Sequence, residues 1–502
     1  MSATENLART YVDIAPVTNG LATVDHQVVY GRRGTGKTHT LQHLAHELEG
    51  QGDLPIYLDL RRIGSANGIY GDPSQGVRSR GTRLLIDVLE AVHSELLLRA
   101  IEDDRFGALL EFLDPLADAA AAVRVQGTVS ATDEHEIEDE DSRLSQSDAS
   151  IALSPRPTAA MSSKREKRSA QRARRTQKSS YQGVEEHFVH FGILGRAISD
   201  ATTSIEPSRL WILLDEWSSV PLDLQPLLAD LLRRTFFTIQ GLTVKIGATE
   251  RRSRFVERRT NAAAGYVGLE LGSDTAAALD LDEHLLMQED GDHAQMFFSE
   301  LIFKHIQDLL RSMDKHLPGT TNDLIAEMFS HGALKEWVRS AGGVPRDAIN
   351  ILGLAASRAG DRRISLEDVQ LAARQFYLRD KEASLAGNPK AERLWGKLQS
   401  EIVLSQRSRT FLVRRVASGP PESVLDLYDA RLIHLLRQGL RSNKHPGQLF
   451  DGYAVDYGTY IDAMARIDLE NAWSAASTPW VYQRGQAVLP DTFDSRVIID
   501  PR

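Results

Sequence analysis

The chain has 502 residues, enough for roughly two to four domains, and its 42% hydrophobic and 25% charged residues are ordinary for a globular protein. The net charge of −10 argues against a generally basic nucleic-acid-binding protein, and the lack of cysteine excludes disulfides and thiolate metal sites. No apolar run approaches the ~20 residues that cross a bilayer, and the first residues lack the pattern of a signal peptide, so we expect a cytoplasmic protein without a membrane partner.

The first predicted strand and helix enclose a phosphate-binding loop. Residues 31–38 read GRRGTGKT, which fits G-x-x-x-x-G-K-[ST], and they stand between an apolar run at 28–30 and a helical pattern at 41–48. Glycines allow several backbone N–H groups to converge on one anion, and the helix dipole adds to the field. We expect Lys37 to reach the β and γ phosphates and Thr38 to bind Mg²⁺; the alternative is a glycine-rich turn with a solvated lysine. The expected nucleotide-binding residues are Gly31, Arg32, Arg33, Gly34, Thr35, Gly36, Lys37 and Thr38.

A second strand is predicted at 56–60 and a helix from 84, with helical character continuing to about 123. Residues from about 125 to 182 interrupt this pattern. Seven of the nine residues at 133–141 are carboxylates, and 164–178 contains eight basic residues. Such a stretch buries too little apolar surface to offset chain entropy, so we predict a disordered, solvated insertion. Contact of its basic block with nucleic acid is the alternative.

Strands and helices alternate again after the insertion. These elements are a helix near 185–201, a strand at 210–214, a helix at 224–231, a strand at 242–248 and a fifth strand at 267–271. Such alternation predicts an α/β fold, with a parallel sheet that is covered by helices on both faces. From about 292 the pattern is mostly helical.

The strand at 210–214 ends in a pair of carboxylates. Asp215 is placed to hold Mg²⁺, and Glu216 to orient and deprotonate a water molecule. Thr249 follows the next predicted strand and therefore lies at the same edge of the sheet, where ligands bind. The alternatives are a surface acidic pair and an ordinary threonine at a strand end. Together with the phosphate loop, these residues predict a catalytic site.

Two further arginine positions fit a nucleotide site. Arg346, in the segment GGVPR, stands in the first turn of a helix, where a cation calls for a compensating anion such as the γ-phosphate. Arg233 and Arg234 end the helix after the acidic strand and are arginine-finger candidates for a neighbouring subunit, with Arg251 and Arg252 as competitors. Solvated arginines and dipole pairing at a helix end are the alternatives.

The order of these features resembles that of the AAA+ ATPases. It is most similar to the clade of origin-recognition and replication-licensing initiators, with the signalling STAND ATPases nearby. The segments GGVPRDAINILGL at 342–354 and ISLEDVQLAARQFY at 364–377 are similar to the lid helices of initiators. The resemblance implies ATP as the nucleotide, Thr249 as the first sensor and Arg346 as the second. It covers roughly 20–60 and 205–380. The 125–182 insertion is not part of the family core, and the additional DNA-contacting helix of the initiators is not located in this sequence.

A third unit begins after residue 388. It combines a helix at 391–404, an apolar stretch at 407–415, a second helix at 422–436 and a short hairpin near 453–460, which suggests a winged-helix-like domain such as the resembled initiators carry. Its basic residues Arg407, Arg409, Arg414 and Arg415 are candidates for DNA phosphate contacts. A winged-helix-like domain used for protein contacts is the alternative.

We therefore expect a P-loop ATPase core at 1–290, a helical lid at 291–385 and a winged-helix-like domain with its tail at 386–502. The predicted function is ATP hydrolysis with Mg²⁺ in a switch or remodeller that acts on DNA through the C-terminal domain. A signalling or defence ATPase that controls protein assembly without DNA, and an inactive nucleotide-binding scaffold, are the alternatives. Candidate partners are DNA and either further copies of the chain or a partner protein.

Overall fold

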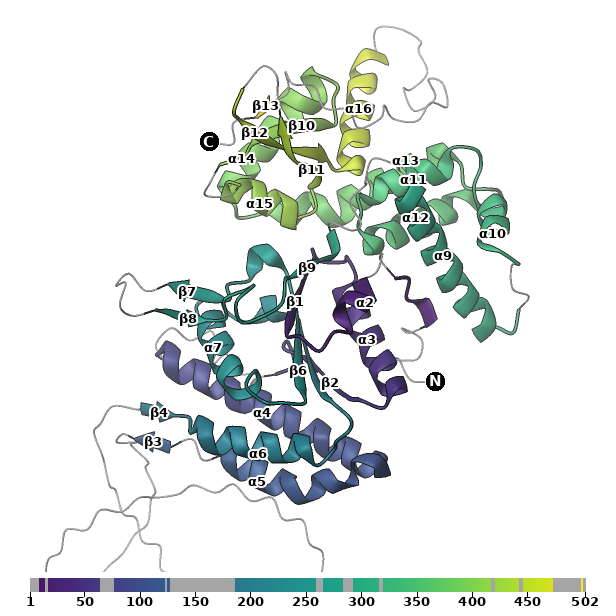
Figure 1. Ribbon diagram of the computed structural model, residues 1–502. Helices are drawn as coiled ribbons and strands as arrows, with labels where there is room; N and C mark the ends of the chain where they lie inside the picture. Colours follow the sequence, from purple (N-terminus) through teal and green to yellow (C-terminus); the bar gives the residue numbers. More distant parts are fainter. Residues whose placement is uncertain are drawn as a thin grey trace, which may run out of the picture.

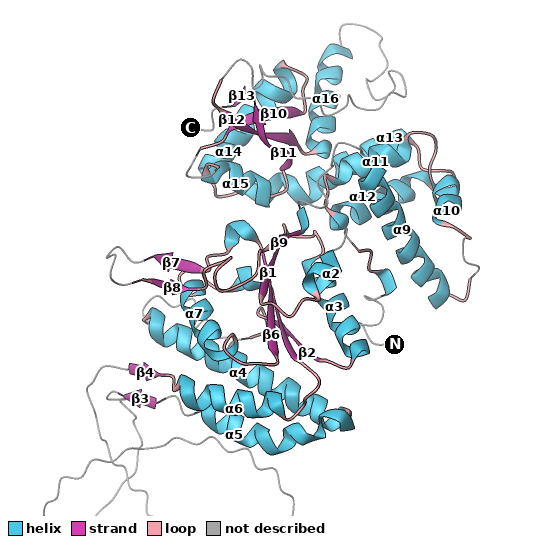
Figure 2. Ribbon diagram, viewed as in Figure 1, coloured by secondary structure: helices cyan, strands magenta, loops and turns pink. Residues whose placement is uncertain are grey.

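The computed structural model describes residues 9–13, 17–63, 76–121, 124–126, 186–258, 265–282, 292–315, 319–416, 420–441, 446–472 and 498–499. Along the chain these residues form a domain built on a parallel sheet, a helical lid and a C-terminal unit with its own sheet (Figure 1). Figure 2 shows strands in the first and third parts, whereas the lid is helical. Within the described ranges, no helix has both the length and the apolar character that a membrane-spanning helix needs.

The first domain is built on a five-stranded sheet in the order β2-β5-β6-β1-β9, and all of its pairings are parallel. The strands are β1 (Gln27–Tyr30), β2 (Leu54–Asp59), β5 (Leu210–Asp215), β6 (Leu242–Ala248) and β9 (Leu279–Asp280). Strand β6 lies between β1, which leads into the phosphate loop, and β5, which ends in the acidic pair. The carboxyl ends of these three strands therefore meet at one edge of the sheet.

Helices cover both faces of this sheet, as the sequence predicts. Helices α2 (Val17–Leu21) and α3 (Lys37–Gln51) lie on one face, whereas α4 (Val77–Glu102) and α7 (Gln225–Phe236) lie on the other. Strand β5 shows why: Trp211 and Leu213 belong to the apolar cluster under α3, and Ile212 and Leu214 belong to the cluster under α4 and α7. Successive side chains of a strand point to opposite faces, so a continuous apolar run fits a sheet buried on both sides.

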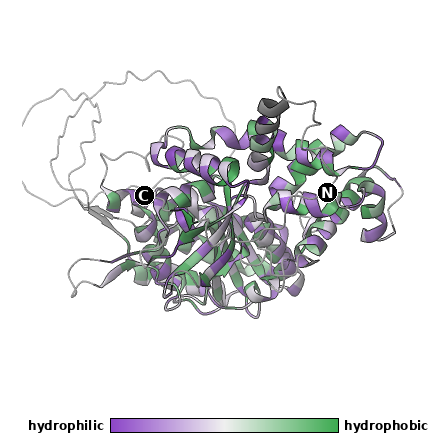
Figure 3. Ribbon diagram, turned by 90° about the horizontal axis from the view of Figure 1, so that it is seen from above, coloured by the Kyte–Doolittle hydropathy of each residue, from purple (hydrophilic) through white to green (hydrophobic). Residues whose placement is uncertain are grey.

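Two more helices, α5 (Leu110–Ala121) and α6 (Phe191–Thr203), form an outer layer beyond α4. Hydrophobic residues are frequent in the middle of the molecule in Figure 3. A short antiparallel ribbon of β3 (Arg124–Gln126) and β4 (Glu186–Phe188) joins the two ends of the segment 127–185. The insertion predicted at about 125–182 lies outside the described residues from 127 onward, so its disorder remains a prediction.

The strand predicted at 267–271 is not the fifth strand of the sheet. Residues Tyr266–Gly268 form β8, which pairs antiparallel with β7 (Val256–Arg258), and β9 takes the edge position beside β1. Gly268 explains the difference, because it has φ +126° and a Cβ there would lie 2.0 Å from the Phe255 carbonyl oxygen. The close backbone approach that glycine permits belongs to a surface ribbon, and an apolar run alone does not reveal it.

The described residues of the lid form five helices, as the helical pattern after 292 predicts. They are α9 (Asp292–Ser312), α10 (Thr321–Met328), α11 (Ala333–Ala341), α12 (Pro345–Ala359) and α13 (Leu366–Phe376). Their packing centres on Trp337, which is fully buried and donates from Nε1 to the Ala348 carbonyl oxygen at 2.9 Å. Ser365 and Asp368 form a capping box that fixes the start of α13.

The C-terminal unit combines helices with a four-stranded sheet. Its elements are α14 (Pro389–Lys397) with a π-helical continuation at Leu398–Ser405, β10 (Thr410–Arg414), α15 (Glu422–Asp429), β11 (Ile433–Arg441), β12 (Leu449–Val455), α16 (Tyr457–Ala472) and β13 (Ile498–Ile499). The sheet order is β11-β12-β10-β13, with antiparallel pairing except between β10 and β13. A mixed unit of helices and a sheet is thus present, whereas the winged-helix-like arrangement and its use in DNA binding remain predictions.

Two boundaries predicted in this unit are wrong. The helix expected at 422–436 ends at Asp429, because Arg431 adopts φ +59° and the chain then enters β11. The hairpin is formed by β11 and β12, and Tyr457 and Tyr460 belong to α16. Apolar residues at 432–436 fit a helix and a buried strand equally well, so the pattern alone did not separate them.

Helix α16 packs into both the lid and the C-terminal unit. Its residues Tyr457 and Ile461 belong to the apolar core of the lid, and Ala463 and Met464 belong to that of the C-terminal unit. Gly458 allows this contact, since a Cβ there would lie 2.3 Å from the Ala373 carbonyl oxygen of α13. The two parts therefore share one helix, while the domain boundaries given above remain predictions.

Candidate nucleotide site

The phosphate loop leads from β1 directly into α3. Gly34 and Gly36 have φ +97° and +107°, a region that side chains other than glycine rarely adopt. Gly31 is restricted by space, because a Cβ there would lie 2.5 Å from the Thr35 hydroxyl oxygen. Lys37 and Thr38 then form the first residues of α3, at the positive end of its dipole. The loop thus has the backbone that an anion-binding nest requires.

Lys37 lies in this nest and is almost fully buried. Its Nζ donates to the carbonyl oxygens of Gly31, at 2.7 Å, and Arg32, at 3.1 Å. Burial lowers the pKa of Lys37, while the negative charges of Asp215 and Glu216 act in the opposite direction. A buried ammonium with only carbonyl partners has a strong demand for an anion, which a phosphate group would meet.

Asp215 ends β5 and connects the acidic strand to the phosphate loop. Its fully buried carboxylate accepts hydrogen bonds from the Thr38 hydroxyl, at 2.6 Å, and from the Tyr57 hydroxyl, at 2.8 Å. Gly247 on β6 makes room for it, because a Cβ there would lie 2.8 Å from its Oδ1. The structure therefore places the two residues predicted to bind Mg²⁺ within one hydrogen bond of each other.

Tyr57 and Gly247 were missed by the sequence analysis. Burial and the charge of Asp215 raise the pKa of Tyr57, so its hydroxyl stays protonated and donates to the carboxylate. A tyrosine in one strand and a glycine in another become meaningful only when the strand order is known. The register of β2 and β5, which pairs Asp59 with Asp215, was the missing information.

Glu216 follows Asp215 with φ +57°, an uncommon conformation for glutamate. The side chain is 35% exposed, and its Oε1 lies 3.6 Å from Nη1 of Arg61. Arg61 is itself held by Asp59, with a 2.7 Å bond from Nη2. Glu216 is therefore at the accessible rim of the site and is restrained by Arg61, while its activation of water remains a prediction.

The lid meets the phosphate loop at Gly34. The backbone N–H of Arg346 donates to the Gly34 carbonyl oxygen at 3.3 Å, and a Cβ on Gly34 would lie 3.0 Å from the Arg346 Cβ. Desolvation and the positive charges of Arg33 and Arg431 lower the pKa of Arg346, whose side chain remains exposed. The structure thus brings Arg346 to the loop, near two further arginines, Arg33 and Arg431.

Thr249 also lies at this edge, immediately after β6. Its backbone N–H donates to the Ser218 hydroxyl at 2.8 Å, which ties the end of β6 to the turn after Glu216. Contact between the Thr249 hydroxyl and a phosphate or water remains a prediction.

Arg32 has a different environment from the one expected for a phosphate-loop residue. Its side chain is 2% exposed and its Nε donates to Asp282 at 2.9 Å, while its backbone N–H donates to the same carboxylate at 2.6 Å. Burial would lower the pKa of Arg32, but the charge of Asp282 raises it. The Arg32 side chain is therefore engaged by the protein itself, and only its backbone lines the loop.

The arginine-finger candidates on α7 both pair with Asp230. Arg233 donates to Asp230 at 2.9 Å and to the Gly268 carbonyl oxygen at 3.1 Å, and Arg234 lies 2.8 Å from the same carboxylate. The Arg234 side chain is 54% exposed against 29% for Arg233, so it is the more accessible of the two. Their insertion into a neighbouring subunit remains a prediction.

The competing candidates follow β6. Arg251 lies 3.6 Å from Glu250, and Arg252 forms a 3.1 Å ion pair with Asp429 at the end of α15. Arg252 thus joins the sheet domain to the C-terminal unit of the same chain.

No cluster of three or more histidine, aspartate or glutamate residues in the described part of the chain could hold a metal ion by itself. Thr38 and Asp215 instead offer a hydroxyl and a carboxylate oxygen beside the phosphate nest. That donor set fits Mg²⁺, which usually binds one or two carboxylates together with substrate phosphates and water.

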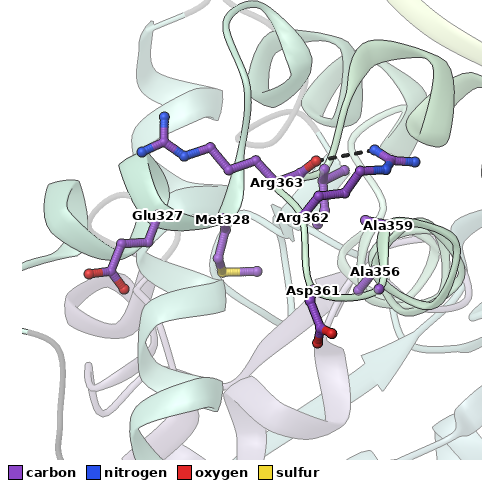
Figure 4. A pocket seen from close by; sticks show the side chains of 9 residues that line it. Glu327, Met328, Ala356, Ala359, Asp361, Arg362 and Arg363 are labelled. Carbon is purple, nitrogen blue, oxygen red and sulfur yellow. Dashed lines mark hydrogen bonds between the residues drawn. The ribbon is translucent and has the colours of Figure 1, made fainter.

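A pocket of about 450 Å³ opens in the lid, between the end of α10 and the turn from α12 to α13 (Figure 4). Glu327, Asp361 and Arg363 give it charges of both signs. Arg362 is held by Asp368 at 2.7 Å and donates to the Arg363 carbonyl oxygen at 3.3 Å. The residues that line this pocket include none from the phosphate loop, so it is separate from the nucleotide site.

No protein-family model and no curated protein matches the chain. Among solved structures, the chain is similar to the RuvB Holliday junction branch migration motor of Thermotoga maritima, with 10% sequence identity, coverage of 89% of this chain and 91% of that chain, and a TM-score of 0.31. A variant of that RuvB gives 12% identity, coverage of 52% and 72%, and a TM-score of 0.23. Scores this low carry no argument, so the fold and the site rest on the geometry described above.

Proposed function

We propose that the chain is a Mg²⁺-dependent ATP hydrolase that works as a switch or remodeller. The observation that carries this proposal is the 2.6 Å hydrogen bond between Thr38 and Asp215, because it joins the phosphate loop to the acidic strand end across β6. An anion nest with a buried lysine, a carboxylate held by hydroxyl groups and an accessible glutamate are the parts that phosphoryl transfer to water requires. Preference for adenine rests on the family resemblance.

Each residue has a separate task in this proposal. Lys37 and Arg346 hold the γ-phosphate, and Thr38 and Asp215 hold Mg²⁺, which neutralises phosphate charge when it is bound. Glu216 accepts a proton from the attacking water. Thr249 orients this water or the γ-phosphate from the end of β6.

The test is Mg²⁺-dependent ATP hydrolysis by the full chain and by Glu216→Gln. We expect the variant to lose about 10²- to 10⁴-fold in kcat, since the amide cannot accept the proton, and to retain its affinity for ATP. Glu392→Gln, an exposed residue on α14, is the matched control and should keep the wild-type rate. Turnover by Glu216→Gln at the wild-type rate would contradict the assignment of the base.

We further propose DNA as the target of the C-terminal unit, on the basis of arginines at one end of its sheet. Arg414 is opposite Phe450 of β12, and Arg441 is opposite the adjacent Leu449 from the other side. Arg415 follows, and its backbone N–H donates to the Leu449 carbonyl oxygen at 2.8 Å. The three arginines are exposed and lie at the same end of β12, which suits contact with a phosphate backbone.

Arg409, another candidate for phosphate contact, is not available. It is 6% exposed, and its Nε donates to the Val455 carbonyl oxygen at 2.9 Å. Arg407 is exposed and remains a candidate.

The DNA proposal is tested by binding of the full chain to duplex and single-stranded DNA as salt is raised. Replacement of Arg414, Arg415 and Arg441 by glutamine should weaken binding and reduce the salt dependence by about three counterions. Glutamine at Arg358 and Arg363 of the lid serves as the control. Lack of binding by the wild-type chain at low salt would instead favour a signalling ATPase that controls protein assembly.

A further inference from the structure

The side chain of Arg32 connects all three parts of the molecule. Besides its ion pair with Asp282 in the sheet domain, it donates from Nη2 to the Gly342 carbonyl oxygen of the lid at 3.3 Å. Its Nη1 lies 3.1 Å from Nδ1 of His434 in β11, and its guanidinium stands 4.4 Å above the ring of Tyr428 in α15. A residue of the phosphate loop is therefore in direct contact with the C-terminal unit.

His434 is held in one orientation by these contacts. An arginine only donates, so Nδ1 of His434 accepts and Nε2 carries the proton toward Asp456 Oδ1, 3.4 Å away. Burial lowers the pKa of His434 to about 4, which keeps the ring neutral. Gly342 leaves the space for this ring, because a Cβ there would lie 2.5 to 2.7 Å from three of its atoms. The imidazole is thus enclosed between the lid and the phosphate loop.

The buried network continues from Asp456 to the second arginine of the site. Lys381 bridges Asp456, at 2.7 Å, and Asp347, at 2.8 Å. Asp347 directly follows Arg346 and also binds Arg431, which lies between α15 and β11. Both ends of the network therefore reach the nucleotide site, one through Arg32 and the other beside Arg346.

Arg32 also takes part in the loop through its backbone. Its carbonyl oxygen accepts hydrogen bonds from Lys37 Nζ, at 3.1 Å, and from the Thr35 hydroxyl, at 2.8 Å. A phosphate that enters the nest competes with the Arg32 carbonyl oxygen for the Lys37 ammonium. Phosphate binding therefore acts on Arg32, the residue whose side chain contacts the C-terminal unit. Removal of one member of a buried charged network leaves its partners uncompensated, which makes the seated arrangement cooperative.

We propose that the C-terminal unit is a working part of the nucleotide site, and that its seating on the phosphate loop through Arg32 and His434 and the binding of nucleotide strengthen each other. The sign follows from charge. Seating brings Arg431 toward Arg346, which itself stands near Arg33 and Lys37, and the phosphates of a nucleotide relieve the repulsion between these cations. The inference rests on the proposed function, because it needs a nucleotide at this loop. His434 acts here as a positioning residue.

Nucleotide binding and seating of the C-terminal unit are thermodynamically linked, which relates their free energies. If nucleotide favours the seated state, loss of seating must weaken nucleotide binding by the same factor by which nucleotide stabilises seating. A coupling of ordinary size corresponds to roughly 5- to 150-fold.

The first measurement is hydrogen exchange of the wild-type full chain with and without Mg²⁺ and ADP or a non-hydrolysable ATP analogue. We expect nucleotide to slow exchange in β11 and in the turn that contains Arg431. Exchange that is unchanged or faster there, in a chain that binds nucleotide, would overturn the proposal. Failure of the wild-type chain to bind nucleotide would overturn the proposed function as well.

The second measurement is nucleotide affinity by fluorescence titration. His434→Leu removes both hydrogen bonds, and we expect it to weaken binding at least 5-fold and to abolish nucleotide-dependent protection of β11. His434→Asn, which retains an acceptor for Arg32, should bind more tightly than the leucine variant. His331→Leu, at an exposed position of the lid, should behave as wild type. Wild-type affinity in a folded His434→Leu chain would show that the contact is structural only.

Discussion

Lys381 offers the sharpest test of the buried network, because two carboxylates depend on one ammonium. It is 1% exposed, between Asp347 at 0% and Asp456 at 3%. Lys381→Met keeps the length of the side chain and removes its charge. Breaking a buried ion pair costs about 3–5 kcal/mol, and we take the lower value, about 3 kcal/mol, because Asp347 retains Arg431 and Asp456 retains His434.

The loss should depend on pH with a defined sign. Burial alone would raise the pKa of Asp456, but Lys381 and the hydrogen bond from His434 hold it well below its usual range. In wild type the contribution of the ionised Asp456 carboxylate to the free energy of unfolding is present above the unfolded pKa of about 3.9 and is lost only below it. Without Lys381 the Asp456 carboxylate prefers its protonated form. The difference in the free energy of unfolding between Lys381→Met and wild type should therefore be largest at pH 7 and decrease toward pH 4.

The assay is urea denaturation followed by circular dichroism and by tryptophan fluorescence, since Trp337 and Trp395 lie in the lid and C-terminal cores. Lys390→Met, on the exposed surface of α14, is the control. The added substitution Asp456→Asn should recover part of the loss, because it removes an unpaired charge. A Lys381→Met chain within 0.5 kcal/mol of wild type at pH 7, or a loss that does not narrow at low pH, would refute the reasoning.

Two further predictions concern the nucleotide site. Gly34→Ala should weaken nucleotide binding about tenfold, since a side chain at φ +97° costs about 1–2 kcal/mol and its Cβ would lie 3.0 Å from Arg346 and 3.1 Å from Val344. The control in the same nucleotide titration is Gly50→Ala, a position within α3 where a Cβ meets no neighbouring atom. Equal nucleotide affinities of the two variants would contradict this reasoning. Arg61→Ala should raise basal ATP hydrolysis by less than about fivefold, because an exposed pair is worth at most about 1 kcal/mol and its loss frees Glu216. Arg62→Ala, with a side chain 87% exposed, controls for loss of charge, and a slower Arg61→Ala enzyme would show that the contact assists Glu216.

The parts of the site that follow from short-range patterns were predicted from the sequence. The phosphate loop at 31–38 and the acidic strand end at Asp215 each combine a local motif with a mainly apolar strand, and the structure joins them by a hydrogen bond. The parallel sheet followed from alternating strands and helices. The lid helix at 366–376 followed from its helical periodicity, and the capping pair Ser365 and Asp368, a signal contained in four residues, was not used.

What could not be predicted depends on strand order and on contacts across hundreds of residues. Arg32 fits a phosphate-binding loop by position, yet its partner His434 lies 402 residues later and has no local signature. Arg61 and Tyr57 become site residues only because β2 is beside β5. Similarly, the helix expected at 422–436 failed because a single left-handed residue, Arg431, turns the same apolar sequence into a strand.

The shared helix α16 also determines how the molecule can be divided and how it can move. A fragment that begins near residue 386 would leave Tyr457 and Ile461 without the lid residues that enclose them. A lid without α16 would leave uncovered the face of α13 that packs against this helix. Any large swing must therefore carry both parts together. Dissection should keep 292–502 in one piece.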